Sequence, residues 1–549
     1  MQVVTAGLAA AAAALAVVPA AGAASGTREV LYVGNNWDGT AHIVDPVTFK
    51  TLGRLNIVPD RRRRVAEIFS NPARAGFFLG NRELVGEGHD QFVDDLFSSH
   101  DGRMLYVSRP SFADVVAIDL RTRKIAWRIR VRGERADHMA ISPDGRYLAV
   151  SASTGAEVHV INTHLGRVVG NFPSGAQPHE NNFSADGKLI YHASIGSVFT
   201  PLDQPSMDAT KGERVFQIVD ARTFKVLKRI DMGKKLDEFG EPDMSGAVRP
   251  MALSPDEKTL YFQVSFFHGF IEYDLERDRV TRLARLPLSA QAKRTPREGY
   301  LLDSAHHGLT MNPQGTKLCA AGTMSDYTAI VDRESFRFSI PSHGKKPYWS
   351  TNGPDGRYCF VSYSGDDAIA AIDYATEKEV ARISVGDHPQ RMRAGRIESA
   401  VLSDPTPVAL AGMRLSRRRF RAARRGRAVA PKGRRLGRRV GTRVRYRLGG
   451  DARVTFRVQR ARRARGRVAG GRCVRRTRAN RSGRRCTRYR TLRGKVTDSG
   501  AQGVNRLRLT GRWRGKRLRR GRYRLIARAR DRAGNRSQQA RARFRIVRR

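Results

Sequence analysis

Histidines, carboxylates and arginines gather shortly before a recurring turn of the type Ser-Pro-Asp-Gly. Aligning the chain on that turn brings together Asp94 and Asp95, Asp137 and His138, His179 and Glu180, Arg249 and Pro250, His306 and His307, Tyr348 and Trp349, and His388 with Arg391. Neutral imidazoles favour divalent transition metals, and buried carboxylates suit acid–base work. These residue types predict a polar, histidine-rich site if the fold brings them together.

The elements that must position these residues form a repeat. Each turn is followed by a short apolar strand, as in Met104-Leu-Tyr-Val107, and then by a strand that ends in Asp, as in Val115-Val-Ala-Ile-Asp119. Seven copies of this unit, at a period of about 42 residues and with four strands each, are typical of a β-propeller. The fold class predicted is all-β: a seven-bladed β-propeller over residues 27–400, followed by a small β-sandwich.

Ring closure explains why distant residues could meet. The first copy lacks its innermost strand, and we expect the segment around Pro389–Arg393 to supply it, which leaves no open sheet edge. The innermost strands then begin at one mouth of the channel. The long insertions 57–93, 195–213, 231–248 and 284–304 belong to the same face, so we expect this face to be the functional one.

The repeated units resemble the YVTN-type β-propeller repeat of exported bacterial proteins, with stretches such as Gln177–Phe183 similar to an actinobacterial subgroup. The resemblance implies the propeller fold and export from the cell. It implies no single activity, because that family includes lactonases, electron-transfer subunits and surface proteins.

Two classes of function follow for the channel mouth. The first is a binding or scaffold protein whose ligand, a small molecule or a protein, contacts Asp94, Asp95, His138, His179, Glu180, Arg249, His306, His307, Trp349, His388 and Arg391. The second is an enzyme, either a lactonase-like hydrolase using Glu180 or one that depends on a metal or redox centre. A transition-metal cofactor would be held by His138, His179, His307 and His388. The alternative is a purely structural role, in which each of these side chains forms hydrogen bonds with neighbouring backbone groups and water.

Common catalytic signatures do not decide between these classes. The sequence contains no Gly-x-Ser-x-Gly, His-Glu-x-x-His, Walker loop or Cys-x-x-Cys-His motif. Catalytic residues therefore stay unassigned, and the sequence leaves open whether the protein is an enzyme.

The N-terminus predicts export. Ala6–Val18 is apolar but too short to span a bilayer, and the small residues of Pro19–Ala24 suit cleavage, so residues 1–24 read as a signal peptide. No later stretch predicts a transmembrane segment. We expect a secreted protein that associates with the cell surface.

Nearly all of the net charge lies at the C-terminal end. The chain carries +51, and residues 405–549 hold 50 Arg and 3 Lys against Asp451, Asp498 and Asp531. Arginine alternates with apolar residues in Val444–Leu448 and Val454–Val458, which predicts strands with one buried face. We expect a basic linker over 401–440 and an immunoglobulin-like sandwich over 441–549, similar to the Arg-rich immunoglobulin-like or fibronectin-like appendages of some exported actinobacterial proteins.

The basic module favours anionic partners. An anionic cell-wall polymer or a membrane surface would bind residues 405–549, whereas the few aromatic residues argue against base stacking and sequence-specific nucleic-acid binding. The alternative is a compositional bias towards arginine. Cys473 and Cys486 are close enough in sequence to form a disulfide, whereas we expect Cys319 and Cys359 to be buried free thiols.

Overall fold

The computed structural model describes residues 26–198, 207, 210–403, 410–431, 437, 439–449, 452–462, 466–469, 472–501, 503–531 and 536–547. The predicted signal peptide, residues 1–24, lies outside the described residues. Within the described ranges, none of the helices has the length and apolar character that crossing a bilayer requires.

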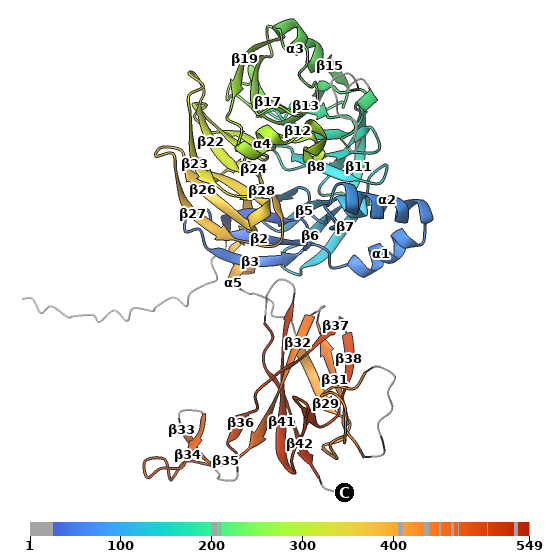
Figure 1. Ribbon diagram of the computed structural model, residues 1–549, viewed down its shortest axis with the longest axis vertical. Helices are drawn as coiled ribbons and strands as arrows, with labels where there is room; N and C mark the ends of the chain where they lie inside the picture. Colours follow the sequence, from blue (N-terminus) through green and yellow to red (C-terminus); the bar gives the residue numbers. More distant parts are fainter. Residues whose placement is uncertain are drawn as a thin grey trace, which may run out of the picture.

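Residues 27–398 form four-stranded antiparallel sheets, which makes this part of the chain a β-propeller (Figure 1). The first sheet joins the two ends of the propeller sequence and contains β28 (Pro389–Glu398), β1 (Thr27–Asn35), β2 (Thr40–Val44) and β3 (Thr51–Asn56). The second contains β4 (Leu96–Ser98), β5 (Met104–Arg109), β6 (Asp114–Asp119) and β7 (Lys124–Arg130). The third contains β8 (Ala136–Ile141), β9 (Tyr147–Ala152), β10 (Glu157–Asn162) and β11 (Arg167–Pro173).

Four further sheets repeat the same pattern in chain order. The fourth contains β12 (Pro178–Phe183), β13 (Leu189–Ser194), β14 (Phe216–Asp220) and β15 (Val226–Ile230). The fifth contains β16 (Val248–Leu253), β17 (Thr259–Val264), β18 (Gly269–Asp274) and β19 (Arg279–Arg285). The sixth contains β20 (Leu309–Met311), β21 (Lys317–Gly322), β22 (Tyr327–Asp332) and β23 (Phe338–His343). The seventh contains β24 (Pro347–Asn352), β25 (Tyr358–Tyr363), β26 (Ala368–Asp373) and β27 (Lys378–Ser384).

The innermost strands form a closed ring. Strands β4, β8, β12, β16, β20, β24 and β28 each contact the next, and β28 contacts β4 again. Strand β28 also pairs with β1 from Thr27↔Glu398 to Asn35↔Pro389, so the last strand of the propeller completes the first sheet. Closure gives the first sheet its fourth strand and brings the starts of seven strands to one rim.

The recurring turn is built by local hydrogen bonds. In the third sheet, Ser142 Oγ donates to Asp144 Oδ1 at 2.6 Å and accepts from the Tyr147 backbone N–H at 2.9 Å. Gly145 has a φ of 72°, a left-handed value that suits glycine. This turn fixes where the innermost strand ends and the second strand begins, so it sets the spacing of the residues before it.

Most innermost strands are irregular where the polar pairs lie. The pairing register shifts between Ala136 and Met139, between Pro178 and Asn181, between Val248 and Met251, and between Pro347 and Trp349. A β-bulge takes residues out of the ladder and redirects their side chains. In these four strands, the bulges release the polar residues at the start of the strand from ordinary sheet geometry.

The insertions add helices on the rim of the propeller. They contain α1 (Arg61–Phe69), α2 (Pro72–Leu84), α3 (Met232–Phe239), α4 (Ala290–Arg294), η3 (Arg297–Gly299) and η4 (Leu301–Asp303). Three other short helices lie outside the insertions: η1 (Pro110–Phe112), η5 (Ser364–Asp366) and α5 (Ser399–Ser403). Arg109 anchors the first insertion: it is fully buried, and its guanidinium donates to Asp114 Oδ1 and to Asp60 Oδ1, each at 2.7 Å.

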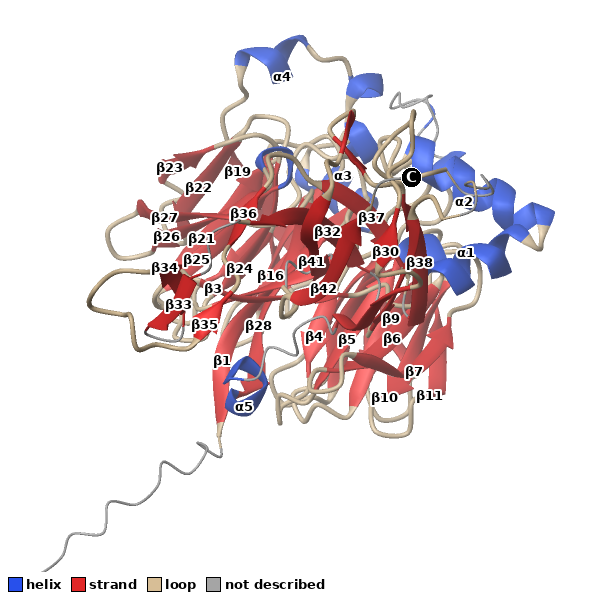
Figure 2. Ribbon diagram, turned by 90° about the horizontal axis from the view of Figure 1, so that it is seen from below, coloured by secondary structure: helices blue, strands red, loops and turns tan. Residues whose placement is uncertain are grey.

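The basic module folds as two main sheets around one core (Figures 1 and 2). One sheet contains β29 (Leu410–Leu415), β31 (Thr442–Leu448) and β38 (Gly503–Leu509). The other contains β30 (Arg419–Phe420), β42 (Ala540–Ile546), β41 (Gly521–Asp531), β32 (Ala452–Ala461), β36 (Tyr489–Thr491) and β37 (Val496–Gly500). Smaller pairings involve β33 (Gly466–Ala469), β34 (Arg472–Arg475), β35 (Arg485–Cys486), β39 (Arg512–Trp513) and β40 (Lys516–Arg517). Residues of β31 and β32 alternate between buried, mostly apolar positions and outward polar positions occupied chiefly by arginine, as the period-two pattern predicts.

The segment 401–440, which the sequence analysis predicts to be a linker, contains structure that belongs to the sandwich. Strand β29 pairs with β31, and Phe420 of β30 is fully buried and stacks on Phe544 with ring centroids 5.3 Å apart. The basic composition of this segment hides these apolar positions. The sandwich therefore begins before residue 441.

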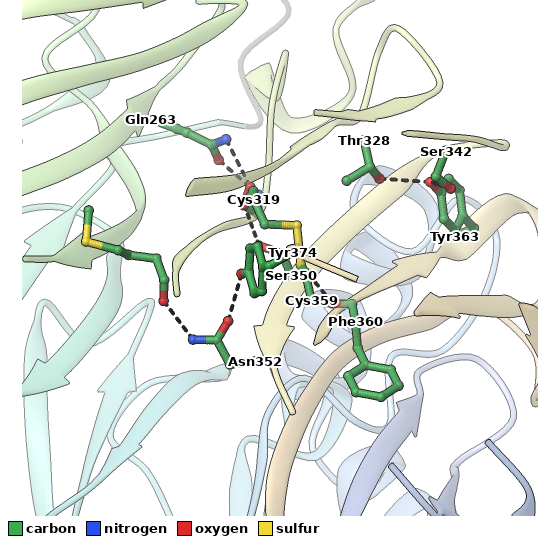
Figure 3. Close-up of a disulfide and its surroundings, with 12 residues drawn as sticks. Gln263, Cys319, Thr328, Ser342, Ser350, Asn352, Cys359, Phe360, Tyr363 and Tyr374 are labelled. Carbon is green, nitrogen blue, oxygen red and sulfur yellow. Dashed lines mark hydrogen bonds between the residues drawn. A yellow bond between two sulfur atoms is a disulfide. The ribbon is translucent and has the colours of Figure 1, made fainter. Parts of the chain in front are cut away.

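A disulfide joins Cys319 of β21 to Cys359 of β25, so the prediction of free thiols is wrong (Figure 3). The two residues lie on the second strands of neighbouring sheets, 40 residues apart, whereas the turns that precede these strands are 41 residues apart. The cysteines are therefore offset by one position within the repeat, and because consecutive strand residues point to opposite faces, their side chains lie on the facing sides of the two sheets. Ser350 Oγ donates to the Cys319 carbonyl at 3.1 Å beside the bridge. Cys473 and Cys486 form the other disulfide, and all four cysteines are paired.

Removal of the inter-sheet bridge is expected to cost stability. In the loop-entropy account, closing a loop of this length stabilises the folded state by about 4 kcal/mol. We expect the Cys319→Ala/Cys359→Ala variant to lose roughly this amount in urea unfolding monitored by tryptophan fluorescence. The matched Cys473→Ala/Cys486→Ala variant should lose about 3 kcal/mol, because its loop is shorter. Two reactive thiols in the unreduced, denatured wild-type protein would contradict the bridge.

Candidate functional site

Seven residues, one from the start of each innermost strand, surround a single cavity at the channel mouth. We call them the mouth ring: Asp94, Asp137, His179, Arg249, His307, Tyr348 and Gln390. Each of the first six lies five residues before its turn, and Gln390 belongs to the strand that closes the ring. Residues at the same position of successive repeats therefore lie close to one another around the channel mouth.

His306 does not belong to this ring, which corrects the sequence alignment. Five residues before the turn at Asn312 is His307, so the expected pair is shifted by one position. Consecutive residues of an extended chain face opposite ways. His306 is buried beside Tyr327, whose hydroxyl lies 3.3 Å from His306 Nε2, and its ring centroid is 5.7 Å from that of His268.

His388 also lies apart from the ring, so its prediction as a metal ligand is not supported by the geometry. It precedes β28 with a φ of 55° and stacks on Trp37, with ring centroids 3.7 Å apart. His89 of the first insertion stacks on Trp37 as well, at 3.9 Å. The left-handed turn before Pro389 directs His388 to this stack.

Three imidazoles from different sheets do converge. His138 of β8, His179 of β12 and His307 before β20 each offer one nitrogen, and these three atoms lie within 4.8 Å of one another. The ring centroids of His138 and His179 are 3.6 Å apart, and those of His179 and His307 are 5.5 Å apart. All three side chains are buried, and His179 Nδ1 has no hydrogen-bond partner among the described residues.

Burial keeps these imidazoles neutral. Desolvation lowers the pKa of each of the three histidines well below its usual value. The nearby Arg391 guanidinium lowers the pKa of His138 and of His307 further, and His307 does the same for His179. Neutral imidazole is the form that ligates metal ions.

Glu180 and Arg391 compete for one nitrogen of His138. Nδ1 of that ring lies 2.6 Å from Glu180 Oε2 and 2.8 Å from Arg391 Nη2. Burial raises the pKa of Glu180 to about 7, against the attraction of Arg391. When Nδ1 carries the proton, it donates to the Glu180 carboxylate, and the opposite nitrogen, Nε2, is left as the free acceptor.

The acidic residues of the site already have cationic partners. Arg391 Nη1 donates to Asp94 Oδ1 at 3.0 Å, and Arg393 donates to both oxygens of Asp95, at 2.9 and 2.7 Å. Asp94 still has its pKa raised well above the usual value, because its burial outweighs the effect of Arg391. Trp349 lies under both guanidiniums, at 4.6 Å from Arg391 and 4.8 Å from Arg393.

Arg249 joins the ring to the fourth insertion. Its Nε donates to Ser265 Oγ at 3.0 Å and its Nη1 to Ser304 Oγ at 2.9 Å, and the Leu302 carbonyl accepts from Nη2. Arg249 therefore holds the rim closed over the site while lining the cavity.

The cavity is small and polar, with a volume of about 30 Å³. Insertion residues complete its wall beside the mouth ring, among them Val85, Gln91, Ile195 and Leu302. A single water needs roughly 10–15 Å³ on this scale, and pockets for drug-sized ligands are about ten times larger than the present one. The site as folded fits an ion with one or two waters.

The sequence did not identify two arginines of the site, Arg393 and Arg135, as site residues. Arg393 lies two positions after Arg391 on β28, so the period of two could have identified it. Arg135 precedes Asp137, and its guanidinium donates to Asp137 Oδ2 at 3.1 Å and to Asn81 Oδ1 of α2 at 3.0 Å. No repeated signal marks Arg135, because its partner comes from an insertion.

Fold and site together define a β-propeller protein with a buried, imidazole-rich polar site at one mouth of its channel. No protein-family model matches the chain, and no curated protein matches it. Among solved structures, the chain is similar to a chain of Kuenenia stuttgartiensis hydrazine synthase, with a TM-score of 0.44 and 17% identity. The similarity covers 56% of this chain and 96% of that chain, and no functional argument rests on it.

Proposed function

We propose that this protein is an exported propeller binding protein that holds a divalent transition-metal ion at its channel mouth through His138, His179 and His307. The convergence of three neutral imidazole nitrogens within 4.8 Å carries this proposal. The Glu180 carboxylate beside His138 Nδ1 matches the outer-shell acceptor that orients most metal-bound histidines. The cavity volume matches an ion better than an organic ligand.

The donor atoms must move a little to bind an ion. Tetrahedral zinc with nitrogen ligands at 2.0–2.1 Å places them about 3.4 Å apart. The imidazoles would therefore draw together by about an ångström, and Arg391 would leave His138 for its other partner, Asp94. A second group, Asp94, Asp137 and His138, also lies within 4.8 Å, but Arg391 and Arg135 already neutralise its carboxylates. The imidazole set is therefore the better metal site.

Calorimetric titration of the chelator-treated protein with Zn²⁺ and Co²⁺ tests the metal site. We expect one ion per chain, and we expect Co²⁺ to give a visible spectrum typical of nitrogen ligation. His179→Ala/His307→Ala should abolish stoichiometric binding, and Glu180→Gln should weaken it about 10–100-fold through loss of the outer-shell acceptor.

His306→Ala is the matched control, because it removes a buried imidazole next in sequence that lies outside the mouth ring. It should bind metal as the wild type does. Equal binding by the wild type and by a correctly folded double variant, judged by its circular dichroism spectrum, would refute the proposed ligand set.

One observation favours a hydrolase as a second candidate. Glu180, with a pKa of about 7, is suited to exchange a proton near neutral pH. Lactone turnover that disappears in Glu180→Gln would support this function, whereas the present cavity volume counts against it. The rim would have to open to admit a lactone.

The basic module is proposed to hold the propeller at an anionic surface outside the cell. This part of the proposal rests on the 50 arginines of residues 405–549 and on the predicted signal peptide. The YVTN-type kinship and the immunoglobulin-like character of the sandwich belong to the same proposal. They rest on the repeated strands and on the two sheets that share one core.

A further inference from the structure

The outer face of the larger sandwich sheet is covered by arginine. We call this surface the arginine face: it contains Arg453 and Arg457 of β32, Arg522, Arg524, Arg528 and Arg530 of β41, and Arg541, Arg543 and Arg545 of β42. All of these side chains are exposed except that of Arg524, which is half-buried. No ion pair joins any of these nine side chains to an acidic residue of the described chain.

Strand register places like charges directly opposite one another. Arg522 faces Arg545, Arg524 faces Arg543, and Arg453 faces Arg530. Arg545 in turn faces Arg419 of β30. Opposed like charges destabilise a sheet, so an array of this kind is stable mainly when anions neutralise it.

One end of this face is concave. Arg418, Arg522, Arg543 and Arg545 line an open pocket with a volume of about 290 Å³, together with Tyr489, Tyr523 and Phe544. We call it the arginine pocket. Next to it, the guanidinium of Arg524 lies 4.1 Å from the Tyr489 ring. The pKa of Arg524 is lowered by burial and then by Arg541 and Arg543, a sign of crowded positive charge.

The chemistry of the pocket favours phosphate on a flexible chain. Guanidinium groups bind phosphate oxygens through paired, parallel hydrogen bonds. A flat bilayer cannot enter a concave pocket, and the aromatic rings of the module lie mostly in its core and cannot stack bases. Arginines two positions apart on a strand recur at about 7 Å, which gives successive phosphates of a chain successive partners.

We propose that the arginine pocket and the arginine face bind a linear phosphodiester polymer without nucleobases, of the poly(polyol phosphate) class. This inference rests on the surface-anchoring part of the proposed function and is independent of the metal site. The pocket seats one phosphate with its linking group, and the neighbouring rows of arginine carry the rest of the chain. The polymer thereby replaces the missing counter-charges of the sheet.

Binding of the full mature protein to immobilised poly(glycerol phosphate), at roughly 0.15 M salt, tests this assignment. Arg522→Gln/Arg543→Gln/Arg545→Gln is the pocket variant. The control is Arg443→Gln/Arg445→Gln/Arg447→Gln, which removes the same charge from the exposed side of β31 in the other sheet. We expect the pocket variant to bind at least about ten-fold more weakly and the control to change by less than about three-fold.

The other outcomes distinguish polymer binding at the arginine pocket from surface anchoring by the whole basic module. Equal losses in the two variants would overturn the pocket while leaving surface anchoring intact. Tighter wild-type binding to phosphatidylglycerol vesicles or to single-stranded DNA than to the polymer would overturn the choice of partner. Absence of binding to every polyanion by protein with a folded circular dichroism spectrum would overturn anchoring as well, and it would leave the metal site untouched, because metal titration tests that site separately.

Discussion

Acidification from pH 6 to pH 5 is expected to destabilise the folded protein by at least about 3 kcal/mol. Burial lowers the pKa of His192 to about 3, and burial likewise lowers the pKa values of His42 and His268 to about 4. The pKa values of five further histidines are lowered well below normal by the same cause: His138, His179, His306, His307 and His388.

The direction follows from proton linkage. Below pH 6.5 the unfolded chain binds protons at these imidazoles and the folded chain does not, so stability is complete above 6.5 and falls as pH decreases towards the folded-state pKa values. Each histidine contributes about 1.4 kcal/mol per pH unit within that window. Glu180, with its raised pKa of about 7, and Asp94, whose pKa burial raises well above its usual value, act in the opposite direction and together offset about two histidines.

Urea unfolding at pH 7, 6 and 5 measures this dependence. His268→Phe is a useful control, because the ring contacts with Tyr300 and His306 can persist while the titrating group is removed. Its stability should fall less steeply with acid, by about 1 kcal/mol per pH unit. An unchanged free energy of unfolding across this pH range in the wild type would show that these imidazoles are not buried as described.

Replacement of Arg391 by methionine is expected to destabilise the propeller by about 3–5 kcal/mol. This guanidinium is fully buried, donates to Asp94, lies beside His138 and covers the Trp349 ring. Its loss would leave the buried Asp94 carboxylate without its cation, and an uncompensated buried charge costs more than the pair contributes.

A double-mutant cycle separates charge from packing. Arg391→Met/Asp94→Asn should recover most of the lost free energy of unfolding, because it removes both charges. The Arg391→Lys variant should also be less stable than the wild type, since an ammonium cannot reproduce the planar contact with Trp349 and the paired hydrogen bonds. A single Arg391→Met variant within about 1 kcal/mol of the wild type would mean that Arg391 is solvated.

Local sequence patterns predict much of the fold. Each sheet has the same turn and strand order, so the same residue types recur: a Ser-Pro-Asp-Gly turn, an apolar second strand and a third strand ending in Asp. The structure contains the predicted turn at Ser142–Gly145 and at the equivalent positions of the other sheets. The same holds for arginine alternation in β31 and β32. The bridge between Cys319 and Cys359 was visible in principle, because their 40-residue spacing is one residue short of the 41-residue spacing of the two turns, and this offset turns the two side chains towards each other across adjacent sheets.

The identity of the candidate metal ligands depends on distances that no local pattern contains. The sequence by itself determined that polar residues stand at the start of every innermost strand, since the turn fixes their place along the chain. Only the tertiary structure decided that His138, His179 and His307 meet, that His306 packs beside Tyr327 and His268, and that His388 stacks on Trp37. Ring closure, the bulges and the left-handed turn before β28 set those directions, because they join strands hundreds of residues apart and periodicity describes only neighbours along the chain.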